Sequence, residues 1–280
     1  MMRKNWALLV PAILLVGCSK PEMDVTDAQY QAHHGEQVVI VHGLARSAWS
    51  MQNMSKGIAD QGYQVCVVDY PTLRQPIENT LDKSAEELSR CILEFNDSRQ
   101  KIDSQALAKH ASGEHVPTNF ALKNHAKIHF VGHSLGGLVI RSYLAEHPDF
   151  VHSEQMGNVV FVGTPNHGSD VADFFSDTWM LSLVGGTAES LTTNPESFPN
   201  RLPLPNYNFG VIAGTQSYPV FNGMFTKTND GLVSVESTKL QGMQDFIEVD
   251  IKHDRLRRDP YVTGLIVQFL QSGQFEPVRE

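Results

Sequence analysis

Apolar and polar residues alternate along this chain in blocks of two kinds. Short apolar runs, rich in β-branched residues, have the length of buried strands. They lie at 37–41, 63–68, 127–131, 158–162, 208–213 and 245–251. Longer segments between them have helical spacing and helix-terminating residues. They lie at 49–61, 80–95, 135–147 and 260–271. Strands that alternate with helices predict an α/β fold, with a mostly parallel sheet covered by helices on both faces.

Two stretches depart from this alternation. Residues 97–126 are polar and irregular, with at most a short helix at 105–111, and their histidines lack metal-ligand spacing. We interpret them as a solvated excursion. Residues 170–205 form a long insertion in which aromatic and aliphatic side chains mix with glycine and proline. Because long ordered insertions are usually functional, we expect a cap or lid with an apolar underside. A small helical layer that only completes the core is the alternative.

The sequence Gly-His-Ser-Leu-Gly at 132–136 carries the strongest chemical signal. It follows an apolar strand and precedes a helix, which is the setting of a turn that exposes a nucleophilic serine. Small residues are needed because the strand and helix run too close together for side chains. The pattern predicts Ser134 as a nucleophile at the carboxyl edge of the sheet, where ligands bind in such folds. A glycine-rich turn with an exposed serine is the alternative.

A serine nucleophile needs a histidine base, and the base needs a carboxylate to orient it. In enzymes with this turn, the acid and then the histidine follow the serine along the chain. His253, just after the last predicted strand, fits the base best, and His167 is its rival. His147 ends a predicted helix and His152 lies in a turn, so we assign neither a catalytic role.

The acid is expected on a loop after the strand that ends near residue 213. Asp230 lies there in an Asn-Asp-Gly turn, which can aim a carboxylate back across the sheet edge. Asp254 adjoins His253 in sequence, but adjacent side chains diverge on an extended backbone. Glu236 and Glu248 are weaker rivals, since Glu248 falls inside a predicted strand. For each of these acids an ordinary surface carboxylate is the alternative.

A tetrahedral intermediate needs two backbone donors for its oxyanion. The Leu135 amide, directly after Ser134, supplies one. The second is expected in the loop after the first strand, where Gly43 permits a tight turn and the Leu44 amide is our choice of donor. We interpret His42 as a residue that shapes this loop rather than as a third member of the triad.

The N-terminus predicts export. Arg3 and Lys4 precede an apolar run at 6–16 that is too short to span a bilayer, as in a secretory signal. The run is followed by Leu-Val-Gly-Cys at 15–18 and resembles a bacterial lipoprotein signal. That resemblance implies that residues 1–17 are removed and that Cys18 becomes the lipid-modified first residue. An ordinary cleaved signal with an incidental Cys18 is the alternative.

By the same resemblance, Ser19 after the modified cysteine implies the outer membrane rather than the inner one. Residues 18–35 are polar and rich in turn formers, and we interpret them as a tether. Residues 36–280 then form the folded domain, which is long enough for one sizeable α/β core. We therefore expect a lipid-anchored protein of the bacterial cell envelope.

The charge composition excludes further classes of binding partner. The net charge is −9, and removal of residues 1–17, which carry two basic and no acidic residues, leaves about −11. An acidic balance argues against nucleic acid and against electrostatic docking on anionic lipid. The link to the membrane is then expected to be the N-terminal lipid. We expect no cofactor, and the oligomeric state stays open.

Two further cysteines, Cys66 and Cys91, lie in a predicted strand and in the helix that follows it. A helix after a parallel strand packs back onto the sheet, so the two side chains could meet. An oxidising envelope favours a disulfide, whereas buried free cysteines are common core residues. Both states stay open at this stage.

Four stretches together resemble the α/β-hydrolase superfamily, and within it the bacterial lipases and esterases of the triacylglycerol-lipase type. They are Val-His-Gly-Leu at 41–44, Gly-His-Ser-Leu-Gly-Gly at 132–137, Gly-Thr-Pro-Asn-His-Gly-Ser at 163–169 and Asn-Asp-Gly-Leu-Val at 229–233. The resemblance implies Ser134 as nucleophile, Asp230 as acid and His253 as base. Some such lipases bind calcium, but Gly210 stands where a second aspartate ligand is expected, so no metal is predicted.

These features predict a lipase or esterase that cleaves carboxylic esters of lipid or other substrates through an acyl-enzyme intermediate. An envelope acyltransferase, a thioester- or amide-cleaving enzyme or a lipid-remodelling enzyme on the same fold and triad is the first alternative. A catalytically silent binding lipoprotein is the second, and a missing triad member would favour it.

Overall fold

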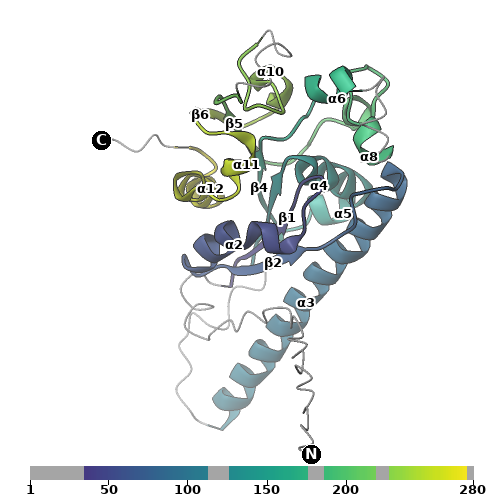
Figure 1. Ribbon diagram of the computed structural model, residues 1–280. Coiled ribbons are helices and arrows are strands. Elements are labelled where there is room, and N and C mark those ends of the chain that lie inside the picture. The colour runs from purple at the N-terminus through teal and green to yellow at the C-terminus, as the bar shows by residue number, and fades with distance from the viewer. Residues whose placement is uncertain (1–34, 113–125, 176–185, 219–226, 276–280) are drawn as a thin grey trace, which may run out of the picture.

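The structure of the protein is a computed structural model that describes residues 35–112, 126–175, 186–218 and 227–275 (Figure 1). Its centre is a single sheet of six parallel strands in the order β2-β1-β3-β4-β5-β6. The strands are β1 Gln37–Val41, β2 Gln64–Val68, β3 Ile128–His133, β4 Met156–Val162, β5 Phe209–Gly214 and β6 Asp245–Val249. Each coincides with a predicted apolar run to within a few residues, and the predicted parallel sheet is confirmed.

Helices cover both faces of the sheet, as predicted. The helices α2 (Gln52–Ala59) and α12 (Pro260–Ser272) pack together on one face, and α3 (Ile77–Ala111) and α4 (Leu135–Glu146) pack on the other (Figure 1). Successive side chains of a strand point to opposite faces. The strand β1 is buried along its whole length because its alternate residues enter two separate cores. Burial on both faces is why four of its five residues, Val38 to Val41, are apolar.

The remaining elements are short and lie in the connections. They are η1 Ala48–Met51, α5 Pro148–Val151, α6 Asp170–Phe175, α8 Gly186–Glu189, α9 Phe198–Arg201, α10 Val235–Thr238 and α11 His253–Leu256. Three of them, α6, α8 and α9, belong to the insertion predicted as a cap, while residues 176–185 of that insertion lie outside the described residues. Its role as a lid stays a prediction.

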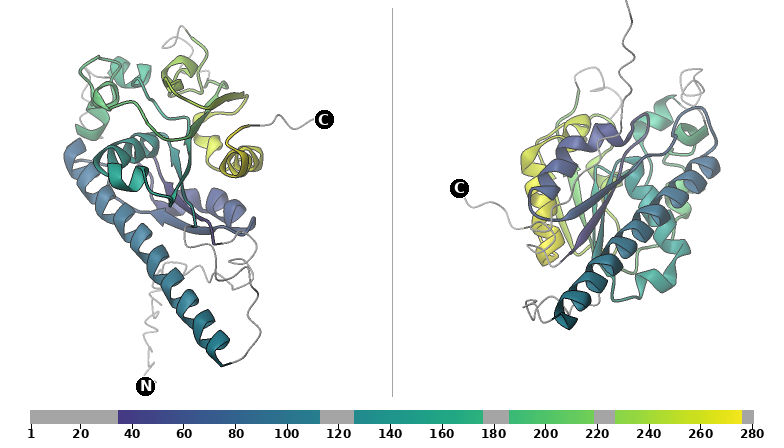
Figure 2. Two further views of the ribbon diagram at one scale, coloured as in Figure 1. Left: turned by 180° about the vertical axis from the view of Figure 1, so that it is seen from behind. Right: turned by 90° about the horizontal axis from the view of Figure 1, so that it is seen from below.

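The helix α3 corrects one prediction. A helix at 80–95 followed by an irregular stretch was expected, but α3 continues through 35 residues to Ala111, a length of about 52 Å. Figure 2 shows its C-terminal part extending past the sheet. The polar sequence was misread as irregular: it contains no glycine or proline between 77 and 111. Ion pairs one turn apart, including Arg90 with Glu87 and Glu94, stabilise the part of α3 that was predicted. Residues 113–125 lie outside the described residues.

The same helix carries a covalent link to the sheet. Cys66 on β2 and Cys91 on α3 form a disulfide, with their Cα atoms 5.9 Å apart. Because α3 packs back against the edge strand that precedes it, the two side chains meet although 25 positions separate them in sequence. Among the described helices, none is both long enough and apolar enough to cross a bilayer.

Candidate active site

Ser134 lies at the sharp turn between β3 and α4. Its backbone has φ 56° and ψ −127°, a conformation that residues other than glycine seldom adopt. Its N–H donates to the Val162 carbonyl at 2.9 Å, which ties the turn to the next strand. A Cβ on Gly136 would come within 2.2 Å of the Val41 carbonyl oxygen, so the glycine is needed for the close approach of helix and strand. The predicted turn is therefore present and is held in a strained shape.

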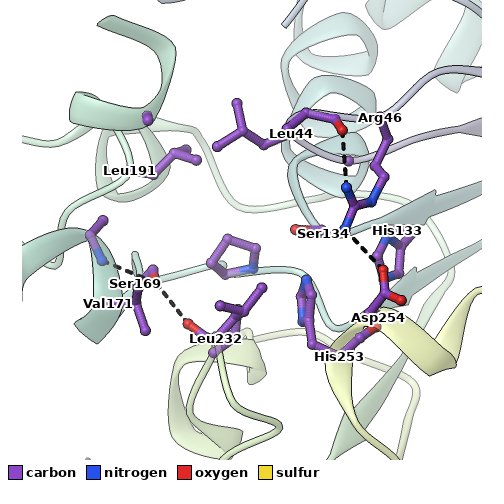
Figure 3. Close-up of a pocket in the computed structure, with 16 residues that line it drawn as sticks. Leu44, Arg46, His133, Ser134, Ser169, Val171, Leu191, Leu232, His253 and Asp254 are labelled. Atoms are coloured by element: carbon purple, nitrogen blue, oxygen red, sulfur yellow. Dashed lines mark hydrogen bonds and ion pairs between the residues drawn. The ribbon is translucent and has the colours of Figure 1, made fainter. Parts of the chain in front are cut away.

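His253 and Asp230 form a buried pair at the same edge of the sheet. The Nδ1–H of His253 donates to Asp230 Oδ2 at 2.7 Å, and the two side chains are 5% and 1% exposed. The other carboxylate oxygen, Oδ1, accepts the amides of Leu232 at 3.0 Å and Val233 at 2.8 Å. These bonds fix the carboxylate and leave Nε2 of His253 as the acceptor nitrogen. Figure 3 shows the His253 ring directed toward Ser134.

Two glycines allow the backbone to pass close to this pair. Gly163 has φ +57°, and a Cβ there would lie 3.2 Å from His253 Nδ1 and 3.3 Å from Asp230 Oδ2. A Cβ on Gly214 would lie 2.7 Å from Asp230 Cβ. The backbone of β4 and β5 therefore forms the wall against which the acid and base rest. The stretch at 163–169 was recognised in the sequence, but the need for glycine at 163 beside His253 and Asp230 is visible only in the structure.

The rival acids point elsewhere. The carboxylate of Asp254 pairs with Arg46 at 2.9 Å, with Arg257 at 2.7 Å and with Arg258. Burial raises the pKa of Asp254, but the hydrogen bond from Arg257 and the three arginine charges outweigh it and hold that pKa well below its usual range. Glu236 pairs with Lys239 on the surface, and Glu248 is exposed on β6.

The rival base, His167, is exposed and bonded to Asn200 at 3.1 Å through Nδ1. It lines a different pocket from the one that Ser134 and His253 share. The structure thus brings Ser134, His253 and Asp230 to one place, as the sequence predicts, and leaves their rivals outside it.

The loop after β1 faces the turn of Ser134. A Cβ on Gly43 would lie 2.8 Å from Ser134 Cβ, so glycine lets the loop approach the nucleophile. Within the described residues, neither the Leu44 amide nor the Leu135 amide donates to another protein group. Two free donors beside a nucleophile are what an oxyanion requires.

His42 holds this loop in place. Its carbonyl accepts the Tyr70 hydroxyl at 2.6 Å, and its ring stacks on that of Tyr70 with centroids 4.4 Å apart. The Ala45 amide donates to Thr72 Oγ1 at 3.0 Å, which ties the end of the loop to the segment after β2. Burial lowers the pKa of His42 despite its hydrogen bond to Gly43 and the nearby Asp69. A buried, neutral histidine here fits the predicted role of shaping the loop.

His133 has a part that sequence analysis missed. Its Nε2–H donates to the His253 carbonyl at 3.0 Å, and the two rings lie 4.9 Å apart. Burial, followed by the charge of His253, holds the pKa of His133 well below its usual value, so the ring stays neutral. It therefore anchors the backbone of His253 as a neutral donor. The only sequence signal was its place as the middle residue of the serine motif.

Ser134 opens into a cavity of about 420 Å³, within the range of about 300–1,000 Å³ usual for small-molecule sites (Figure 3). Its walls come from the loop after β1, from the segment after β4, and from α6 and α8. Most of the lining side chains are apolar, including Leu44, Pro165, Val171, Ala172, Ala188, Leu191, Leu232 and Val233. An apolar cavity that ends at a serine is suited to an acyl chain.

The described residues offer no cluster of three or more His, Cys, Asp or Glu side chains placed to hold a metal ion. Gly210, at the position that resemblance assigns to a calcium ligand, lies inside β5 instead. A Cβ there would come within 2.4 Å of the Phe269 ring, so this position belongs to the core.

Comparison with known proteins supports the fold. Residues 37–198 match a family model described as palmitoyl protein thioesterase. The chain is similar to the mature lipase BlEst2 of Bacillus licheniformis, with 20% identity and a TM-score of 0.57 over 84% of this chain and 92% of that one. It is also similar to a metagenomic carboxyl esterase, with 16% identity and a TM-score of 0.53 over 85% and 75%.

A third similar structure is phospholipase PlaB from Legionella pneumophila, with 14% identity and a TM-score of 0.56. The match covers 85% of this chain but 59% of PlaB, so the chain corresponds to part of that protein. At these identities the solved structures establish the fold alone. Together with the six-stranded parallel sheet, they establish an α/β-hydrolase fold.

Proposed function

We propose that this chain, which belongs to the palmitoyl protein thioesterase family, hydrolyses carboxylic esters of fatty acyl groups, with Ser134 as nucleophile, His253 as base and Asp230 as the orienting acid. The observation that carries the proposal is the buried Asp230–His253 pair, whose free ring nitrogen faces a strained serine at the end of an apolar cavity. This arrangement is recognised by geometry and roles rather than by sequence position.

In the acylation step, Nε2 of His253 accepts the proton of the Ser134 hydroxyl as its oxygen attacks the ester carbonyl. Asp230 keeps the proton of His253 on Nδ1 and stabilises the imidazolium that forms. The Leu44 and Leu135 amides bind the oxyanion, and each such donor typically lowers the barrier by about 3–4 kcal/mol. The imidazolium then protonates the leaving alcohol, and an acyl-enzyme remains.

In the deacylation step, His253 takes a proton from water, which attacks the acyl carbonyl. The same two amides stabilise the second oxyanion, and proton return to Ser134 releases the fatty acid. His133 acts as a positioning residue in both steps, because it holds the carbonyl of His253.

A thioester substrate is the second candidate, favoured by the match of residues 37–198 to the palmitoyl protein thioesterase model. The chemistry differs only in the leaving group, since a thiolate leaves more readily than an alkoxide and needs less help from His253. The walls of the cavity accept the acyl part in either case.

We further propose that the protein is anchored in the bacterial envelope by lipid on Cys18, with the outer membrane as its destination. The motif at 15–18 supports this proposal. Mass spectrometry of the N-terminal peptide from the producing cell tests it: a diacylglyceryl-modified Cys18 is expected, and a peptide that begins elsewhere without lipid would contradict it.

The central experiment measures hydrolysis of p-nitrophenyl esters, with acyl chains from acetyl to palmitoyl, beside the matching acyl thioesters. Wild type is compared with Ser134→Ala and with Ser153→Ala, a serine distant from the cavity. We expect Ser134→Ala to lose activity and fluorophosphonate labelling, while Ser153→Ala keeps both. Equal activity in wild type and Ser134→Ala would refute the proposal. Preference for thioesters of the same acyl chain would favour the second candidate.

A further inference from the structure

Large apolar side chains that the proposed chemistry does not use are exposed on segments joined to the loop after β1, and that loop lines the active-site cavity. The loop after β1 continues into η1, where Trp49 is 74% exposed, and the loop after β2 presents Leu73 at 47% exposure. The two loops are joined by hydrogen bonds from the Ala45 amide to Thr72 Oγ1 at 3.0 Å and from the Ala48 amide to Asp69 Oδ1 at 2.8 Å. The segments that carry the exposed Trp49 and Leu73 are therefore joined to each other.

Exposed arginines belong to the same surface. Arg46 and Arg74 lie in the two loops just described, and Arg255 and Arg258 lie in α11 and directly after it. Arg257 Nη1 donates to the Ser50 carbonyl at 2.7 Å, so α11 packs against η1. The exposed set Arg46, Trp49, Leu73, Arg74, Arg255 and Arg258 is called the pocket rim below.

Two carboxylates lie among these arginines. Asp69 is half-exposed beside η1, and the carboxylate of Asp254 is shared among Arg46, Arg257 and Arg258. Figure 3 shows Arg46 and Asp254 meeting beside Ser134 and His253. The pocket rim is consequently positive, although the whole chain has a net charge of −9.

We propose that the pocket rim docks on the surface of a bilayer that contains anionic phospholipid. Tryptophan is enriched where proteins meet the headgroup region of a membrane, and basic side chains close to an anionic leaflet are attracted to it. Charge complementarity and an exposed tryptophan thus favour one occupant for this surface. The net charge argued against such docking, but net charge does not describe how the charged residues are distributed over the surface.

The tether predicted from the sequence is compatible with this orientation. The described chain begins at Gly35, before β1, at the edge of the sheet opposite the rim. Gly35 follows Cys18 by 17 positions, a length of chain that spans up to about 60 Å when extended. A lipid on Cys18 therefore leaves the rim free to face the same membrane.

Docking gives the cavity a direct supply of substrate, and in this respect the inference rests on the proposed function. A fatty acyl chain in the outer layer of the bilayer lies next to the mouth of the cavity when the rim is seated. It can reach Ser134 without exposure of its methylene groups to water, which is the costly step for an apolar chain.

The test is co-sedimentation with vesicles of phosphatidylcholine alone or mixed with phosphatidylglycerol. Every variant is the whole chain with Cys18→Ser, so no lipid on that residue contributes and the N-terminal segment is common to all. We expect Arg255→Glu to weaken partition to the mixed vesicles at least about fivefold, and Trp49→Ala to weaken it several-fold. Salt should reduce binding of the parent chain.

Two matched controls lie on the solvent side of α3: Lys83→Glu and Leu93→Ala, whose side chains are 56% and 62% exposed. They should bind as the parent does. Equal binding of the parent to both vesicle types, or an equal loss in Lys83→Glu and Arg255→Glu, would overturn the inference. A concentration-dependent dimer that Trp49→Ala abolishes would instead assign the surface to a second copy of the chain.

Binding is measured without turnover, so the two proposals can fail separately. Ser134→Ala should partition as the parent does, because Ser134 is not part of the pocket rim. Loss of ester hydrolysis in the parent with intact binding would contradict the proposed function alone, and hydrolysis without binding would contradict the docking surface alone.

Discussion

Replacement of Asp230 by asparagine is the sharpest test of the proposed triad. The two side chains have the same shape, and the site is fully buried, so the change is confined to one oxygen that becomes an NH₂ group. The two ends of the side chain have different partners. Oδ1 accepts the amides of Leu232 and Val233, while Oδ2 accepts the Nδ1–H of His253.

The backbone amides of Leu232 and Val233 determine the orientation of the asparagine side chain. If its NH₂ group faced Leu232 and Val233, two buried amide donors would lose their acceptor, at a cost of about 1–3 kcal/mol each. The NH₂ group therefore faces His253 and donates to Nδ1. The ring proton moves to Nε2, and the nitrogen that faces Ser134 no longer accepts a proton.

The expected loss follows from this change of tautomer. The equivalent substitution in a serine protease lowers kcat by about 10⁴-fold, so a loss of roughly 10³ to 10⁴ is expected here, or about 4–5.5 kcal/mol of barrier. The acyl cavity is unchanged, so KM for a p-nitrophenyl ester should stay within a few-fold of wild type. The assay is steady-state kinetics on that ester, with thermal unfolding as a check on the fold.

Glu248→Gln is the matched control, because it makes the same chemical change at an exposed carboxylate on β6. It should keep wild-type kinetics. An Asp230→Asn variant that folds and retains activity within tenfold of wild type would refute the assignment of Asp230. An equal loss in Glu248→Gln would show that the effect does not come from the triad.

Three further predictions concern the surroundings of the site. Gly43→Ala should stay folded but lose most of its activity and react more slowly with fluorophosphonate, because the added Cβ lies 2.8 Å from Ser134 Cβ. An unchanged kcat would contradict the placement of the loop. His133→Gln keeps a donor for the His253 carbonyl but cannot titrate. Because burial and the charge of His253 hold the pKa of His133 well below 6.5, the unfolded chain binds a proton below that pH and the native one does not. Below pH 6.5, the free energy of unfolding of wild type should therefore fall faster than that of His133→Gln, by up to about 1.4 kcal/mol for each pH unit. Urea unfolding that weakens equally in both proteins between pH 7 and pH 5 would exclude this. Replacement of both Cys66 and Cys91 by serine should cost about 3.5 kcal/mol of stability, from the 25 positions enclosed by the disulfide, and an unfolding midpoint equal to that of wild type would contradict it.

Much of the fold could be read from local patterns. A strand buried on both faces is mostly apolar, which is why β1 and β3 were recognised with nearly correct ends. The turn of Ser134 was recognised because its backbone demands small neighbours within a few positions. The order of acid and histidine along the chain follows from the order of the strands that carry them.

The length of α3 was misjudged for a related reason. Its second half lacks the apolar stripe that marks a packed helix, so polarity was taken as a sign of irregular chain. The absence of glycine and proline over 77–111 was the signal to weigh.

The sequence by itself determined the sheet, the nucleophile turn and the residue types available for a triad, because these depend on periodicity and on backbone conformation within short segments. The sequence favoured Asp230 over Asp254, but only the tertiary structure placed the Asp230 carboxylate on His253, because their contact joins side chains 23 positions apart. The tertiary structure also decided that His133 supports the base and that a basic, aromatic surface gathers beside the cavity of an acidic chain. Those features join residues distant in sequence, and distances through space exist only once the chain has folded.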